Sequence, residues 1–104
     1  MRGPFVLCKS CVNMIVPPRM LGVFGLSNEK DAMHMVRRAE RNACDEIKTY
    51  WPDYKYFWFQ LAASPRDAYT IECELYHAKL EGKNGNLHPK APLATGWHCP
   101  ACKR

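Results

Sequence analysis

The chain lacks the segments that mark membrane and secreted proteins, and it lacks the common catalytic motifs. No apolar run approaches the roughly 18 residues that a membrane-spanning helix requires. The first residues have no apolar stretch followed by a small-residue cleavage site, as a signal peptide would. There is no Gly-rich phosphate loop, no Gly-x-Ser-x-Gly elbow and no His-Glu-x-x-His motif. We therefore expect a cytoplasmic, intracellular protein that is not an enzyme and has no small-molecule substrate.

The size and composition predict one globular domain. The 104 residues are 47% hydrophobic and 24% charged. A chain of this length buries only about two-thirds of its unfolded surface, so its stability is marginal. A metal site that forms only on folding adds its binding free energy to that stability. We expect a single domain over residues 1–104, with a zinc module from 1–19 and 93–104 and a body from 20–92.

Two Cys-x-x-Cys pairs stand near the two ends of the chain. Cys8 and Cys11 form the first pair, and Cys99 and Cys102 form the second. Zn²⁺ prefers four soft ligands in a tetrahedron, and each pair supplies two from one tight turn. The four cysteines predict one structural zinc ion that joins the termini. A secreted disulfide scaffold is the alternative for six cysteines in a short chain.

The two pairs resemble the zinc knuckles of zinc-ribbon proteins, and Pro100 within the second pair is typical of such knuckles. Zinc ribbons share their metal site but differ in function, since many bind DNA or RNA and many bind proteins. The resemblance is confined to the metal site, because a long insertion separates the pairs here. His98, beside Cys99, is an alternative ligand.

A redox role for the cysteines is a remote alternative. The segment from Trp97 to Cys102 resembles a thioredoxin-like active site, but such a motif normally begins a helix, which lowers the pKa of the first thiol. The chain ends two residues later, and the other pair runs toward Pro17 and Pro18. Dithiol oxidoreductase chemistry is therefore not favoured. Cys44 and Cys73 fall on the expected core faces, where cysteine behaves as a small apolar residue.

The hydrophobic pattern predicts an α+β fold with one central helix on a short antiparallel β-hairpin. Apolar residues at three- and four-residue steps favour the helix, and the aromatic-rich and alternating segments favour the strands. Ser64-Pro65-Arg66-Asp67 has the form of a type I turn between those strands. The expected elements are a hairpin over 5–16, a connection over 19–26, a helix over 28–50, strands over 54–62 and 68–80, and a loop over 81–96.

Basic residues are concentrated at the ends of the chain. Residues 1–19 and 83–104 contain three and four basic side chains and no acidic ones, whereas the middle of the chain is slightly acidic. A zinc site that joined the ends would create a basic module suited to phosphate. We expect association with nucleic acid or with a nucleic-acid-handling protein. The candidate contacts are Lys9, Arg37, Arg38, Arg41, Lys83, Lys90, Lys103 and Arg104.

An aromatic sheet face favours a second function. In a register that pairs Ala63 with Ala68, the face away from the helix carries Phe57, Phe59 and Tyr76. An exposed aromatic patch suits a protein partner. The alternative function is therefore a protein-binding adaptor or inhibitor, of the kind that phages encode, and the same face would permit a homodimer.

Overall fold

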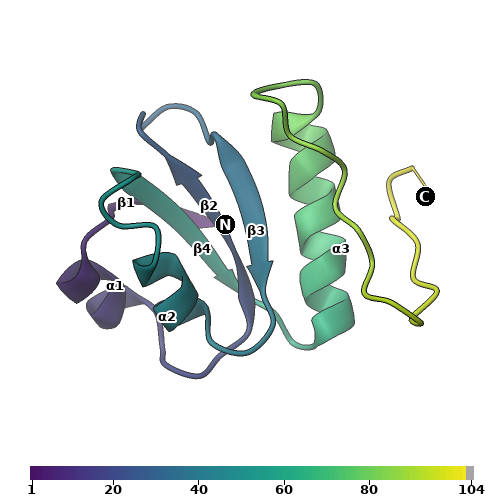
Figure 1. Ribbon diagram of the computed structural model, residues 1–104, viewed down its shortest axis with the longest axis horizontal. Coiled ribbons are helices and arrows are strands. Elements are labelled where there is room, and N and C mark those ends of the chain that lie inside the picture. The colour runs from purple at the N-terminus through teal and green to yellow at the C-terminus, as the bar shows by residue number, and fades with distance from the viewer. Residues whose placement is uncertain (103–104) are drawn as a thin grey trace.

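Four strands form one antiparallel sheet in the order β1-β4-β2-β3. The structure is a computed structural model and describes residues 1–102 (Figure 1). The α+β class predicted from the sequence is confirmed. The elements in chain order are β1 (Arg2–Val6), α1 (Lys9–Ile15), β2 (Gly22–Ser27), β3 (Met35–Ala39), α2 (Ala43–Lys48), β4 (Tyr56–Leu61), α3 (Pro65–Leu75) and a short π-helical turn, η1 (Tyr76–Leu80).

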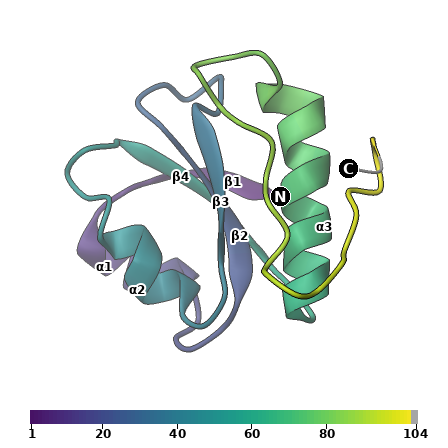
Figure 2. The same ribbon diagram turned by 45° about the vertical axis from the view of Figure 1, so that its right-hand side comes forward.

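Helices cover both faces of the sheet (Figure 2). Helices α1 and α2 lie on one face and α3 lies on the other. Side chains alternate between the two faces along a strand, so successive residues of β4 enter different cores. Phe57 and Phe59 pack with the α1 and α2 layer, and Trp58 between them packs with α3. The sheet is therefore the middle of three layers, and all three aromatic side chains are buried.

The predicted strand over 68–80 is wrong, because this segment is helix α3 followed by η1. Ser64 is the N-cap of α3, and its Oγ accepts a hydrogen bond from the Asp67 N–H at 3.0 Å. Pro65 occupies the first helical turn, where a missing N–H costs nothing. The sequence Ser64-Pro65-Arg66-Asp67 is thus a helix start instead of a hairpin turn, and the predicted Ala63–Ala68 register does not exist.

The long helix predicted over 28–50 is also wrong, because no residue before Ala43 in this range is helical. Residues Met35–Ala39 form β3, which pairs with β2, and only Ala43–Lys48 is helical. Asn42 caps α2 by accepting the Asp45 N–H, which begins a new helix at this point. Val36 and Ala39 are both buried, but they face opposite sides of a strand instead of one side of a helix.

The N-terminal predictions need a similar correction. The expected hairpin over 5–16 is instead the edge strand β1 followed by α1, and the expected connection over 19–26 contains most of the central strand β2. Every residue of β2 is buried, because β2 lies between β3 and β4 and is covered on both faces. The strand predicted over 54–62 is confirmed as β4.

Candidate metal centre

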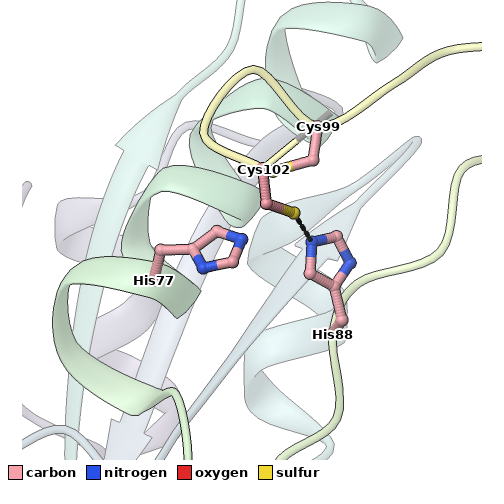
Figure 3. Close-up of side chains that lie close together, drawn as sticks. All are labelled: His77, His88, Cys99 and Cys102. Atoms are coloured by element: carbon pink, nitrogen blue, oxygen red, sulfur yellow. Dashed lines mark hydrogen bonds between the residues drawn. The ribbon is translucent and has the colours of Figure 1, made fainter. Parts of the chain in front are cut away.

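Four side chains from the last third of the chain converge on one point (Figure 3). They are His77 of η1, His88 of the following loop, and Cys99 and Cys102 of the C-terminal segment. One donor atom from each lies within 4.8 Å of all the others. Bonds of about 2.0–2.3 Å to a tetrahedral metal would place such donors roughly 3.3–3.8 Å apart. The group could hold a metal ion after a small contraction.

His77 presents an uncommitted nitrogen to the centre. Among residues 1–102, its Nε2 is the one side-chain nitrogen or oxygen that is buried without a hydrogen-bond partner. Its Nδ1 lies 3.3 Å from the Glu81 Oε2. A carboxylate on the far nitrogen orients a metal-binding imidazole and raises its basicity. The π-helical turn, closed by a 2.8 Å bond from the Glu81 N–H to the Tyr76 carbonyl, positions both side chains.

His88 is oriented in the same way. Its Nδ1 lies 2.7 Å from the carbonyl oxygen of Pro89, so the Nδ1–H tautomer donates to that oxygen. That tautomer leaves Nε2 with a lone pair, and Nε2 lies 3.3 Å from the Cys102 Sγ. Both histidines therefore have one nitrogen engaged by the protein and the other directed at the thiols, which is the usual arrangement around a bound metal.

The Cys99 thiol is buried and held in a polar environment. Burial raises its pKa, but hydrogen bonds from the backbone N–H groups of Cys102 and Ala101 outweigh that effect and lower the pKa to about 6. Thiolate is the form that binds metals. Tyr69 and Cys73 of α3 pack against Cys99, and burial raises the pKa of the Cys73 thiol to about 12. Cys99 is thus a prepared ligand, whereas Cys73 stays a neutral part of the core.

The structure divides the predicted four-cysteine set. Cys99 and Cys102 belong to the metal-binding group, but Cys8 and Cys11 do not, because they form a disulfide with each other. Figure 1 shows α1, which follows Cys8, at one end of the molecule and the C-terminal segment at the other, along an axis of 37 Å. The sheet and α3 lie between them, so the ends are not joined by a shared metal.

The sequence analysis does not place His77 and His88 in the metal-binding group. It assigns His77 to a strand over 68–80, and it offers His98 as the alternative ligand because that residue is next to Cys99; His98 is exposed and is not in the group. The available signal is proximity in the sequence, because His77 and His88 lie 22 and 11 residues before Cys99. Of the two further cysteines, Cys44 is buried beside Asn13 and Cys73 is buried beside Cys99, as predicted for core positions.

Three of the predicted phosphate contacts meet next to the metal centre. Arg37 and Arg38 of β3 and Lys90 of the loop line one hollow with the carboxylate of Glu72, which projects from α3, and with Glu40, whose Oε1 lies 3.4 Å from the Arg38 Nε. Two adjoining cavities of about 410 and 280 Å³ share Arg37, Glu72 and Lys90 in their walls. We call these two cavities together the basic hollow. His34 and His88 also line its larger part.

Glu72 is tied into the hollow by Arg38. The Arg38 Nη1 donates to the Glu72 Oε1 at 2.6 Å, and its Nη2 donates to the Lys90 carbonyl at 2.6 Å. Burial raises the pKa of Glu72 above its usual range, although the charge and hydrogen bond of Arg38 and the charge of Arg37 oppose this. Arg38 therefore connects the edge strand β3, helix α3 and the C-terminal loop at one point.

The other predicted nucleic-acid contacts are dispersed. Lys9 lies at the far end of the molecule, where its Nζ is 5.4 Å from the centroid of the Trp51 ring. Arg41 is exposed just before α2, and Lys83 is exposed in the turn after η1. Lys103 and Arg104 lie outside the described residues. Lys9 therefore lies too far from the described C-terminal segment to form the predicted basic module with it.

The predicted protein-binding patch is wrong. Phe57, Phe59 and Tyr76 are 0%, 4% and 7% exposed, because each packs into the core on one side of the sheet. The homodimer expected through this face loses its basis.

Comparison of the chain with protein-family models, with curated proteins and with solved structures finds no match. Within residues 1–102, no helix has the length and apolar character needed to cross a bilayer. The interpretation of the site therefore depends on its geometry.

Proposed function

We propose that this protein binds nucleic acid through the basic hollow, and that a structural zinc ion in the metal centre holds the hollow together. The observation that supports this most directly is that Arg37 and Arg38 of β3 converge on one concave surface with Lys90, which lies 52 residues after Arg38. Cationic side chains around a hollow attract phosphate, and arginine binds it through paired N–H groups.

Zinc is the metal that suits the donor set. Two imidazole nitrogens and two thiolates form a Cys₂His₂ set, which is common in structural zinc sites. Four protein ligands complete the tetrahedron and leave no position for a reactive water, so this zinc would stabilise structure without taking part in catalysis. The lowered pKa of Cys99 and the free Nε2 of His77 favour such binding.

The metal centre and the hollow are linked through a short stretch of loop. His88 is a ligand, and Lys90, two residues later, accepts the Arg38 hydrogen bond through its carbonyl. Asn86 donates to the His34 carbonyl at 2.8 Å and fixes the same loop to the end of β3. A zinc ion bound to His88 would therefore keep the loop, and its lysine, against the arginines of β3.

Fluorescence anisotropy with labelled oligonucleotides, over a range of salt concentrations, tests this function. The double variant Arg37→Ala/Lys90→Ala should bind more weakly, and the slope of log K against log salt should fall by about two, one for each lost phosphate contact. Lys9→Ala is the matched control, because it removes an exposed lysine at the opposite end of the molecule. Affinity that ignores salt, or an equal loss in the control, would contradict the proposal.

One observation favours a second candidate function, the cleavage of phosphodiester bonds. Glu72 is the single charged side chain among residues 1–102 that is buried, and it faces the hollow that we assign to phosphate. A carboxylate repels phosphate, so it weakens a surface that only binds. It is useful where it holds a divalent cation or transfers a proton. Burial together with specific charge partners is typical of functional groups.

Cleavage is tested separately from binding. Plasmid and single-stranded substrates are incubated with the protein in Mg²⁺ or Mn²⁺, beside the variant Glu72→Gln. Loss of cleavage in Glu72→Gln with oligonucleotide binding retained would support an enzymatic role. Binding by the wild-type protein without any cleavage would leave the protein as a binding module.

A further inference from the structure

The disulfide between Cys8 and Cys11 is independent of the metal centre. It joins the residue that precedes α1 to the third residue of that helix. Both cysteines are half-buried and therefore accessible in part to solvent. The zinc-ligand role predicted for these two cysteines is wrong, because both sulfurs are committed to this bond.

Metal binding does not explain the pair within one chain. A closed zinc site needs four ligands. Among residues 1–102, the one group of three or more His, Cys, Asp or Glu side chains suited to a metal is the C-terminal one, and it excludes Cys8 and Cys11. The chemistry left to two adjacent cysteines is oxidation and reduction.

The two sulfurs have different surroundings. Cys11 lines an apolar hollow of about 260 Å³ together with Phe5, Val6, Met14 and Ile15. Val6 and Met14 are 61% and 86% exposed, so this hollow opens to solvent. The Cys8 Sγ instead accepts the Cys11 backbone N–H at 3.1 Å and lies 3.3 Å from the Ser10 Oγ. Cys11 is thus the cysteine that borders the open hollow, where an incoming thiol can be placed, and Cys8 is the sulfur whose negative charge the protein can stabilise.

We propose that Cys8 and Cys11 form a thiol–disulfide exchange site that reacts with low-molecular-weight thiols of the glutathione class. An incoming thiolate attacks the Cys11 Sγ, the Cys8–Cys11 bond breaks, and Cys8 leaves as a thiolate that accepts the hydrogen bonds described above. A second thiol then displaces the first as a disulfide and leaves Cys11 reduced. The protein gains two electrons and two protons, and two thiols become one disulfide.

The experiment counts thiols in buffers of reduced and oxidised glutathione. After an acid quench, the full-length chain is unfolded, freed of metal by chelator and alkylated, and its mass is measured. The oxidised protein should show four reactive thiols, and the reduced protein should show all six. A count that stays constant across the buffers would overturn the proposal.

Two matched variants test the direction of attack. Cys8→Ser keeps a good N-cap residue at this position and leaves Cys11 without its disulfide partner. It should accumulate a mixed disulfide with glutathione, whereas Cys11→Ser, which leaves Cys8, should accumulate much less. Equal labelling of the two variants would overturn the assignment of Cys11 as the attacked sulfur. A metal ion retained by wild-type protein and lost from both variants would overturn exchange in favour of ligation.

Discussion

The two Cys-x-x-Cys motifs have the same spacing and different chemical environments. Cys8 and Cys11 lie at the start of α1, a helix whose Val12, together with the C-cap residue Val16, is buried in the larger core. Cys99 and Cys102 lie in residues 81–102, which contain no helix or strand. The first pair is closed on itself by a disulfide, and the second pair faces two histidines. The surrounding structure, and not the motif, decides what the cysteines do.

The contrast has a physical basis. A Cys-x-x-Cys turn brings two sulfurs together wherever it occurs, but a metal site needs two more ligands from elsewhere in the chain. Only the C-terminal pair lies beside η1, where the helix end presents His77. The C-terminal segment also has few other means of support, so metal binding should contribute far more to its order than the disulfide contributes to the order of α1.

Substitution of one cysteine in each motif by serine gives the largest expected effect, a difference in metal content and in hydrogen exchange. Cys99→Ser should lose the zinc ion proposed above, and amides of residues 81–102 should exchange with solvent much faster, while the sheet stays protected. Cys11→Ser should retain one metal ion per chain and show faster exchange only near α1. Native mass spectrometry and hydrogen exchange measure both outcomes.

A chelator provides the control for this comparison, because it removes the metal without changing the chain. Chelated wild-type protein should reproduce the exchange pattern of Cys99→Ser. If chelation instead loosened α1, or if Cys11→Ser lost the metal, the four-cysteine zinc site predicted from the sequence would be correct and the separation of the two motifs would be wrong.

The core on the α1 and α2 side can be weakened without touching the metal centre. Phe57→Ala removes a fully buried ring and should lower the free energy of unfolding by about 3–5 kcal/mol. The folded fraction should still bind metal, because Phe57 faces the α1 and α2 layer and the centre adjoins α3. Urea denaturation and metal content per folded chain measure the two effects.

Leu61→Ala is the matched control on the same strand. Leu61 is 43% exposed, so its truncation should cost well under the Phe57 value. If Phe57→Ala left stability unchanged and abolished binding to another protein, the exposed aromatic patch predicted from the sequence would be restored.

Sequence reasoning succeeds where a signal depends on one local segment. The aromatic strand β4, the helical turn over Ala43–Lys48 and the membership of Cys99 and Cys102 in a possible metal site are identified correctly. It fails at Ser64-Pro65-Arg66-Asp67, because the same four residues suit both a type I turn and a capped helix. The type I turn interpretation predicts a strand in place of α3. That prediction separates His77 from its partners and leaves Phe57 and Phe59 exposed.

The basic hollow could not be predicted from the sequence, for a related reason. Arg37 and Arg38 are identified as cationic, but on a helix that β3 replaces. Arg38 contacts Glu72 and Lys90, which lie 34 and 52 residues after it in the chain. Such contacts follow from the sheet topology, which a hydrophobic pattern does not determine when two faces of a sheet are covered.

The smallest expected effect is on the pH dependence of stability. It compares the two helical layers directly, because each layer contains one buried or partly buried glutamate. Burial raises the pKa of Glu72 in α3 and of Glu46 in α2 above the ordinary 4.5, and the charge of Glu40 adds to the effect at Glu46. A raised pKa means that the folded chain holds the proton more tightly than the unfolded chain. The stability from each group is therefore complete below about pH 4.5 and declines as the pH rises through the folded-state pKa.

Glu72→Gln and Glu46→Gln should each flatten this decline, because glutamine does not titrate. A tenfold difference in proton affinity between folded and unfolded chains is worth about 1.4 kcal/mol. Urea denaturation at several pH values between 4.5 and 7 measures the slope. Loss of metal at the acid end affects the variants and the wild type alike, so it cancels in the difference. Glu72→Gln should give the larger change, since its carboxylate is buried; a larger change in Glu46→Gln would mean that solvent reaches the basic hollow more freely than the α2 surface.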